Sequence, residues 1–359
     1  MSRIRKRIEE IHFDRNNESL FVKVLKPVSY IYNKVTGLRR DIYSKRLLKS
    51  GVAGCYTIAV GNLTYGGTGK TPVVISLAGM FSDRGFRVGI VHSGYGSPQH
   101  KNKKVRRGMN GDEGPLYGDE AAELFVRAKD ALVYSSRNRA EAIERAILEG
   151  GVNVCILDDA FQYLKIASNL KILVVDYQDR FGNEHCLPAG PMRESKKALL
   201  DADVVWFVSQ QKYEIDRTME KDFREINNSL RFIYSHFRPD SLIRISDMKV
   251  FGIPQGGRRV VSFSGIGRDK RFTQMLNQIG VEPLGHLSFG DHYRYRDKDI
   301  EKINSTARKC GADMVITTEK DYLRDTKMLS KVEGLHILRI NLEITEGGSE
   351  LERLCDSLA

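Results

Sequence analysis

Cysteine and proline are scarce in this sequence, tryptophan occurs once, and no long apolar run interrupts its 359 residues. The five cysteines are scattered and form no C-x-x-C pair, which excludes a disulfide scaffold and a structural zinc site and favours a reducing compartment. No stretch approaches 18 consecutive apolar residues, so a membrane-spanning helix is excluded. The first ten residues lack an apolar segment, and we therefore expect no cleaved signal peptide.

The composition is that of a globular protein. Hydrophobic residues make up 41% and charged residues 29% of the chain, which excludes a disordered or collagen-like protein. The net charge is +11, and residues 1–50 alone carry 13 Lys and Arg against 5 Asp and Glu. A nucleic-acid binder usually spreads its basic charge over a domain face, so we expect no nucleic-acid partner. The oligomeric state stays open.

Apolar residues recur at helical spacing between Leu20 and Leu48, and basic residues lie on and beside the opposite face. The apolar stripe consists of Val24, Val28, Ile31, Val35, Leu38 and Ile42. Such a helix either lies in a membrane interface, with its cations facing anionic headgroups, or packs on the next domain. The pattern leaves both interpretations open.

Strand and helix patterns alternate from Tyr56 onward, which predicts an α/β fold with a parallel sheet covered by helices on both faces. The segment IPQGGRR at 253–259 is rich in turn residues and is the best candidate for a domain boundary. We therefore expect three parts: a basic amphipathic helix at 1–50, a P-loop NTPase-type domain at 51–252, and a smaller C-terminal α/β domain at 253–359.

A phosphate-binding loop follows the first predicted strand. The string G-G-T-G-K-T ends at Thr71 and matches the P-loop pattern, except that Thr64 stands where its first glycine is expected. Glycines allow backbone N–H groups to converge on phosphate oxygens, and the helix N-terminus adds positive charge. We expect ATP to bind a set of seven residues: Thr64, Gly66, Gly67, Thr68, Gly69, Lys70 and Thr71.

A second apolar strand ends in the acid pair Asp158-Asp159, which is the layout of a magnesium-binding strand end in P-loop proteins. Acid pairs of this kind also cap helices, but the P-loop favours the metal interpretation. We expect Asp158, Asp159 and the Thr71 hydroxyl to hold Mg²⁺, and Lys70 to reach the β- and γ-phosphates.

The class of P-loop protein is narrowed by two observations. A GTPase needs a guanine-reading N/T-K-x-D motif, and the nearest string, Thr318–Asp321, has its lysine one place too late. A nucleic-acid-stimulated ATPase needs a basic domain face, whereas the charge here lies in the N-terminal helix. An alternative that stays open is a regulatory ATPase that acts on a membrane or RNA partner.

From about Leu38 to its end, the chain resembles the tetraacyldisaccharide 4′-kinases of lipid A biosynthesis. The motifs that carry the resemblance occur in the family's order: V-G-N-L-T-Y-G-G-T-G-K-T-P, G-D-E, L-D-D-A-F-Q-Y, L-P-A-G-P-M-R-E, F-S-G-I-G, D-H-Y and T-T-E-K-D. The resemblance implies transfer of the γ-phosphoryl group of ATP to the 4′-hydroxyl of a tetraacyldisaccharide 1-phosphate, which forms lipid IVA. It also implies a peripheral location at the cytoplasmic face of the inner membrane, through the N-terminal helix.

The resemblance implies that the aspartate of G-D-E is the general base and that the histidine of D-H-Y, here His292, assists it. G-D-E occurs twice, and we choose Asp119 over Asp112 because an apolar helix follows Asp119 directly. Arg193 and Glu194 match family positions associated with substrate contacts. Together with Lys70 as a catalytic residue, we expect four residues in the substrate pocket: Arg193, Glu194, Asn62 and Gln162.

The chain departs from the family where S-R-G-Y is common after the second strand. Here His92-Ser93-Gly94-Tyr95 stands in its place, so the usual arginine is absent and any contact assigned to it is in doubt. Ala160 and Tyr163 replace the commoner glycine and histidine of D-D-G-F-Q-H, which is a milder change.

Overall fold

The computed structural model describes residues 3–17, 19–94, 106–107, 119–253, 257–356 and 358. Its main sheet contains the strands β2 (Tyr56–Gly61), β3 (Val88–His92), β4 (Arg106–Arg107), β5 (Leu132–Ser135), β6 (Val154–Leu157), β8 (Leu170–Asp176), β9 (Val204–Ser209), β10 (Arg231–Arg244), β11 (Lys249–Gly252), β12 (Val260–Ser264), β13 (Pro283–Ser288), β14 (Met314–Thr318) and β15 (Leu335–Glu346). A separate small sheet pairs β1 (Gly51–Val52) with β7 (Ile166–Ala167).

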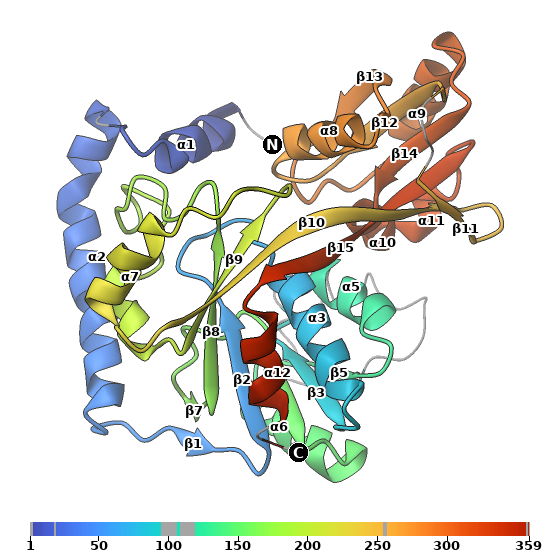
Figure 1. The fold of residues 1–359 in the computed structure, drawn as a ribbon. Helices are drawn as coiled ribbons and strands as arrows, with labels where there is room; N and C mark the ends of the chain where they lie inside the picture. Colours follow the sequence, from blue (N-terminus) through green and yellow to red (C-terminus); the bar gives the residue numbers. More distant parts are fainter. Residues whose placement is uncertain are drawn as a thin grey trace.

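The helices of the described residues are α1 (Arg3–Phe13), α2 (Leu20–Ser44), α3 (Lys70–Ser82), α5 (Asp119–Arg127), α6 (Arg139–Gly150), the 3₁₀ helix η1 (Lys196–Asp201), α7 (Thr218–Ile226), α8 (Asp269–Gln278), α9 (Asp297–Lys309), α10 (Glu319–Arg324), α11 (Thr326–Leu329) and α12 (Gly348–Asp356). The main sheet follows the order β13-β12-β14-β15-β10-β9-β8-β2-β6-β3-β5-β4, and β11 pairs with β10 beside this path (Figure 1).

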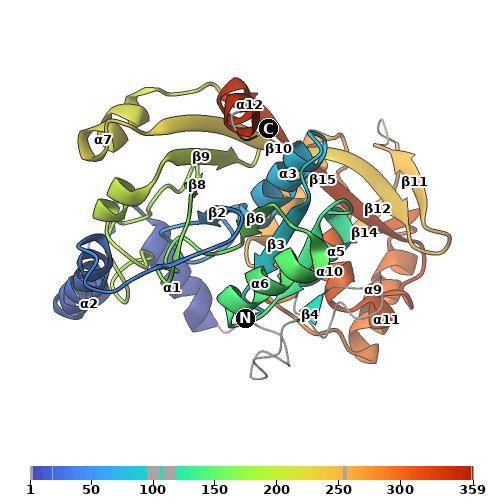
Figure 2. The same ribbon diagram turned by 90° about the horizontal axis from the view of Figure 1, so that it is seen from below.

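The central strands are parallel and buried on both faces, as the sequence predicts. Alternate residues of β2 enter different cores: Ile58 and Val60 pack with α3, whereas Ala59 packs with α6. Figure 2 shows α3 and α6 on opposite sides of β3 and β6. Burial on both faces explains why these strands read as continuous apolar runs rather than as an alternating pattern.

Strand β10 joins two sets of parallel strands. It pairs in parallel with β9 and antiparallel with β15, which begins the second set (Figure 1). Strand β9 ends opposite His236, whereas β14 ends, through its pairing with β15, opposite Leu242. Six residues of strand span roughly 20 Å. The carboxyl ends of the two sets therefore face each other across a short length of β10.

The predicted division at 253–259 stays a prediction. The main sheet continues from the first predicted domain into the second through β10 and β15. The last helix, α12, packs back on α3 of the first part, and its residues Leu351 and Cys355 enter the same core as α3. The C-terminal residues thus contribute to the core of both parts.

Helix α2 is docked on the chain by its buried Val22 and by polar contacts. The guanidinium of Arg40 forms ion pairs with Glu194 and Asp201, and the Ser29 hydroxyl accepts a hydrogen bond from the Ala189 amide at 2.8 Å. By contrast, five residues of the predicted apolar stripe are between 51% and 64% exposed: Val24, Val28, Ile31, Val35 and Leu38. The helix packs on the chain, but these five residues of its apolar stripe stay exposed. No helix among the described residues has both the length and the apolarity to cross a membrane.

We expect Arg40→Ala to lower the free energy of unfolding by about 3 kcal/mol, because it leaves the buried Glu194 carboxylate without its cation. Urea denaturation measures this loss. Arg39→Ala is the matched control, because Arg39 is exposed and donates one hydrogen bond, to the Gln162 carbonyl at 3.2 Å. Equal losses in the two variants would contradict the assignment of Arg40 as the anchor of α2.

Candidate functional site

The carboxyl ends of three neighbouring parallel strands meet at one edge of the sheet. Strand β2 leads into the glycine-rich loop, β3 ends at His92, and β6 leads into Asp158 and Asp159. Ligands of open α/β sheets bind at such an edge. The strand order therefore gathers the predicted phosphate loop and the predicted acid pair in one place.

The glycine-rich loop has the backbone that a phosphate cradle requires. Gly66 and Gly69 have φ angles of +101° and +87°, in the left-handed region that favours glycine. A Cβ atom on Gly69 would also lie 2.9 Å from Cγ1 of Val208. Helix α3 begins directly after Gly69 and has no side-chain cap. Its N-terminal amides are therefore available to an anion.

The departure at Thr64 has a structural explanation. Thr64 forms an isolated antiparallel bridge with Met192, and the next amide, of Tyr65, donates to the Pro191 carbonyl at 3.0 Å. The φ angle of Thr64 is not positive. The backbone here is paired like a strand, so glycine is not required at this place in the loop.

Asn62 stabilises the glycine-rich loop through hydrogen bonds of its side chain. Its side chain is fully buried; its amide nitrogen donates to the Thr68 hydroxyl at 3.0 Å, and its amide oxygen accepts from Nζ of Lys70 at 3.3 Å. The Gln162 side chain donates to the Asn62 carbonyl at 2.8 Å. Two residues predicted to contact substrate therefore have partners inside the loop.

Asp159 lies between two cations. Its carboxylate accepts from Arg193 at 3.0 Å and lies 3.6 Å from Nζ of Lys70. Burial alone would raise the pKa of Asp159, but Lys70 and Arg193 hold that pKa below its ordinary value. Its backbone is left-handed, with φ +47°, and Arg139 donates to its carbonyl at 2.9 Å. In this arrangement Asp159 pairs with both the phosphate-loop lysine and Arg193.

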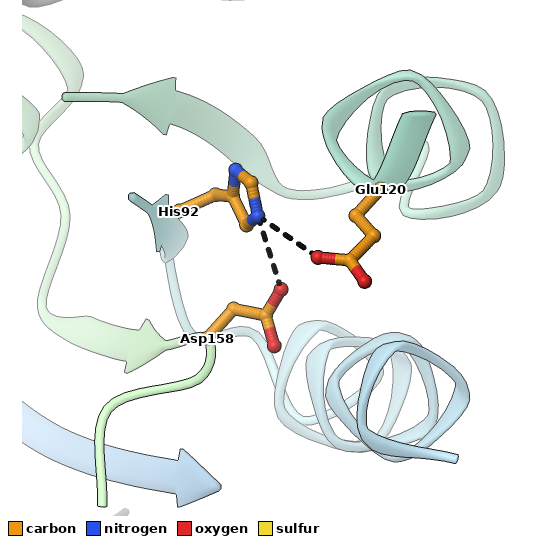
Figure 3. A group of neighbouring side chains, drawn as sticks. All are labelled: His92, Glu120 and Asp158. Carbon is orange, nitrogen blue, oxygen red and sulfur yellow. Dashed lines mark hydrogen bonds and ion pairs between the residues drawn. The ribbon is translucent and has the colours of Figure 1, made fainter. Parts of the chain in front are cut away.

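The acid cluster consists of His92, Glu120 and Asp158. Nε2 of His92 lies 3.4 Å from a Glu120 oxygen and 3.8 Å from an Asp158 oxygen, as Figure 3 shows. The three candidate ligand atoms lie within 4.8 Å of one another. Asp158 is 1% exposed, and among the described residues neither of its carboxylate oxygens has a hydrogen-bond partner. A buried carboxylate without donors fits a bound cation.

Burial governs the electrostatics of this cluster. It raises the pKa of Asp158 to about 6, although the neighbouring His92 side chain acts in the opposite direction. Burial would also raise the pKa of Glu120, but the hydrogen bond from His92 and the charge of Lys320 hold it well below its ordinary value. Lys320 comes from α10, which packs against α5. The C-terminal part of the chain therefore contributes positive charge to this edge.

The remaining predicted residues are placed as follows. Glu194 is buried against Arg40 of α2, whereas the Arg193 side chain is 30% exposed. His292 is 55% exposed, with Nε2 3.9 Å from an Asp291 oxygen, on the loop after β13. Asp119 is the first residue of α5, but its side chain and all of Asp112 lie outside the described residues.

Three residues at this edge were not among the site residues predicted from the sequence: His92, Glu120 and Lys320. Glu120 and Lys320 lie in motifs that carry the family resemblance, and His92 lies where the chain departs from the family, so the sequence contained a signal for each. Glu120 directly follows Asp119 in G-D-E, and Lys320 is the lysine of T-T-E-K-D. His92 ends β3 next to β6, but only the strand order brings it to Asp158.

Helix α1 also reaches the loop, which the sequence did not suggest. His12 is 3% exposed; its Nδ1 lies 2.8 Å from the Tyr65 hydroxyl, and its Nε2 lies 3.1 Å from the Pro188 carbonyl. Phe13 packs edge-on to the Tyr65 ring and beneath the guanidinium of Arg268. The end of α1 thus contacts both the phosphate loop and the C-terminal part.

Comparison with known proteins gives a consistent result. The family model described as tetraacyldisaccharide-1-P 4′-kinase matches residues 21–358. A tetraacyldisaccharide 4′-kinase of Desulfatibacillum aliphaticivorans is 32% identical, covering 96% of each chain, and one of Syntrophus aciditrophicus is 32% identical, covering 86% of each. The crystal structure of LpxK from Aquifex aeolicus in complex with ATP is similar, with a TM-score of 0.71 and 25% identity over 94% of this chain and 99% of that chain.

Glu123, on α5 beside the acid cluster, makes the stability of the protein depend on pH. Burial raises its pKa from 4.5 to about 7, against the charges of Lys320 and Arg127. The unfolded chain therefore releases this proton at lower pH than the folded chain, and Glu123 reduces the free energy of unfolding as pH rises through this window. We expect Glu123→Gln to be more stable than the wild type at pH 8, by on the order of 2 kcal/mol, and nearly equal to it at pH 4.

Urea denaturation at the two pH values measures this difference. The exposed Glu144→Gln is the control and should follow the wild type at both. A constant offset between Glu123→Gln and the wild type across the range would show that Glu123 does not titrate in this way.

Proposed function

This chain belongs to the tetraacyldisaccharide-1-P 4′-kinase family, and from that membership we propose how it transfers the γ-phosphoryl group of ATP to the 4′-hydroxyl of a tetraacyldisaccharide 1-phosphate. The observation that carries the proposal is the convergence of Lys70 and Asp158 at one sheet edge, from the loop after β2 and from the end of β6. The comparisons give no support to a regulatory ATPase.

The glycine-rich loop and the N-terminus of α3 bind the phosphates of ATP. Lys70 moves from its partners Asn62 and Asp159 to the phosphate oxygens, which carry more charge than one carboxylate. Arg193 is also paired with Asp159, and its side chain is partly exposed, so it can bind a second anionic group of the reactants. Phosphoryl transfer consists mainly of such positioning and charge neutralisation.

Asp158, Glu120 and the Thr71 hydroxyl suit Mg²⁺, because hard cations prefer oxygen ligands. The two Asp158 oxygens without hydrogen-bond partners among the described residues support this assignment. When bound, Mg²⁺ neutralises charge on the transferred phosphoryl group. Asp159, which was expected as a further ligand, is better suited by its contacts to hold Lys70 and Arg193.

Asp119 accepts the proton of the attacking 4′-hydroxyl. It begins α5 directly before Glu120, so the base and the metal-binding carboxylate are adjacent in the chain. His292 assists from the C-terminal part: it follows the carboxyl end of β13, and the carboxyl ends of that strand set face the ends of β2, β3 and β6. The acceptor lipid then binds between the two facing edges.

Helix α2 holds the enzyme at the membrane surface that contains its lipid substrate. Its exposed apolar stripe enters the interface, and the lysines and arginines beside the stripe contact anionic headgroups. We therefore propose a peripheral location at the cytoplasmic face of the inner membrane, where ATP is available.

We expect Asp119→Ala to lower kcat for transfer of labelled γ-phosphate to tetraacyldisaccharide 1-phosphate by about 10²- to 10⁴-fold, because the hydroxyl loses its proton acceptor. Asp112→Ala is the matched control from the other G-D-E string and should change kcat by less than about twofold. A fall in Asp112→Ala alone would move the base to Asp112.

In the same assay, His292→Ala should lower kcat with little change in KM for ATP, because His292 acts on the acceptor side. Unchanged turnover would remove His292 from the mechanism. If the wild type binds ATP and transfers nothing to this lipid, the proposed acceptor is wrong.

The exposed stripe of α2 predicts lipid binding. Replacing Val24 and Val35 by serine should lower partition onto vesicles that contain anionic lipid by about tenfold, because two apolar side chains no longer enter the interface. Val52 and Val250 are exposed valines away from α2, at 89% and 58%, and their double replacement by serine is the control. Vesicle sedimentation measures both, and equal losses would exclude α2 as the membrane-binding element.

A further inference from the structure

His92 stands among the metal-binding groups, and its hydrogen bonds determine what it can do there. The side chain is 1% exposed at the end of β3. One ring nitrogen, Nε2, faces Glu120 and Asp158, as Figure 3 shows, whereas the other, Nδ1, lies 3.0 Å from the backbone nitrogen of Gly94. Both nitrogens therefore have defined neighbours.

The Gly94 contact fixes the position of the ring proton. A backbone N–H can only donate, so Nδ1 accepts and carries no hydrogen. The single proton of the neutral ring is then on Nε2. A histidine that binds a metal through Nε2 needs a lone pair there and usually donates the proton of its other nitrogen. The Gly94 amide prevents that arrangement.

We propose that His92 is a positioning residue, which donates its Nε2 proton to Glu120, holds this carboxylate beside Asp158 for the divalent cation, and does not bind the cation itself. The proposal rests on the proposed metal-binding role of Glu120 and Asp158. Nothing in the G-D-E or L-D-D motifs assigns a role to this histidine, which stands at one of the chain's departures from its family.

The hydrogen bond from His92 matters because the Glu120 side chain is less constrained than that of Asp158. The Glu120 side chain is 39% exposed and extends from the first turn of α5, whereas Asp158 is fixed and buried at the end of β6. A partly exposed glutamate has several rotamers, and a hydrogen bond from a buried ring selects one of them. The site remains a set of oxygen ligands, which is the set that Mg²⁺ prefers.

Metal binding without nucleotide or lipid tests this proposal. The probe is Mn²⁺, added to the full chain, with its free fraction measured by electron paramagnetic resonance. Loss of an outer partner of a metal ligand lowers metal affinity by about 10- to 100-fold, and we expect His92→Ala to weaken Mn²⁺ binding about tenfold or more. His92→Gln retains an N–H donor and should recover most of that loss. His286→Ala removes a histidine of the C-terminal part and should leave binding unchanged.

Two spectroscopic measurements on the wild type need no variant. Nitrogen NMR of the metal-free protein should show His92 protonated at Nε2 and not at Nδ1. Pulsed electron paramagnetic resonance of the Mn²⁺-bound protein should show no directly coordinated imidazole nitrogen. A coordinated nitrogen, or the opposite tautomer, would overturn the proposal.

The outcomes separate the positioning role from the proposed function. Equal Mn²⁺ affinity in the wild type and His92→Ala overturns the positioning role alone. A wild type that binds no Mn²⁺ overturns both this role and the assignment of Glu120 and Asp158 as metal ligands. Neither result depends on phosphoryl transfer, which the labelled-phosphate assay measures separately.

Discussion

The antiparallel pairing of β10 with β15 determines where the functional groups of this molecule lie. On either side of it the strands run parallel, and the pairing turns the second set so that its carboxyl ends face those of the first. Loops that follow strands in both sets are thereby brought toward one region. Contacts of α5 with β15 and α10 fix the spacing: Arg127 donates to the Ile340 carbonyl of β15 at 2.9 Å and pairs with Glu319 of α10 at 3.2 Å.

Most of the parallel strands could be predicted, whereas the strand that joins the two sets could not. Strands such as β2 and β6 are buried on both faces and therefore read as short apolar runs. Strand β10 contains Pro239 and Asp240 near its middle, and its pairing with β15 shifts register between Pro239 and Ser241. Turn-forming residues at a bulge give one continuous strand the pattern of two separate segments.

The candidate site was predictable where its residues are close in sequence. The glycine-rich loop and the Asp158-Asp159 pair each follow a strand and carry their signal locally. The position of His92 beside Glu120 and Asp158 depends on β3 lying next to β6, and no local sequence pattern predicts that pairing. Recurrent motif residues also proved to have packing roles: Asp321 of T-T-E-K-D accepts from the Gly265 amide of F-S-G-I-G at 3.0 Å, and a Cβ on Gly265 would lie 2.9 Å from that carboxylate.

Two adjacent residues connect the exposed helix α2 with the phosphate loop. Glu194 is the buried partner of Arg40 on α2, and Arg193 is the partner of Asp159, which also holds Lys70. The Arg193 amide donates to the Leu63 carbonyl at the start of the loop. Neighbouring residues of one chain cannot move independently, so the docking of α2 and the pairing of Lys70 constrain each other. In the proposed function α2 lies on the lipid surface, and this link would then also fix the position of that surface relative to the phosphate loop.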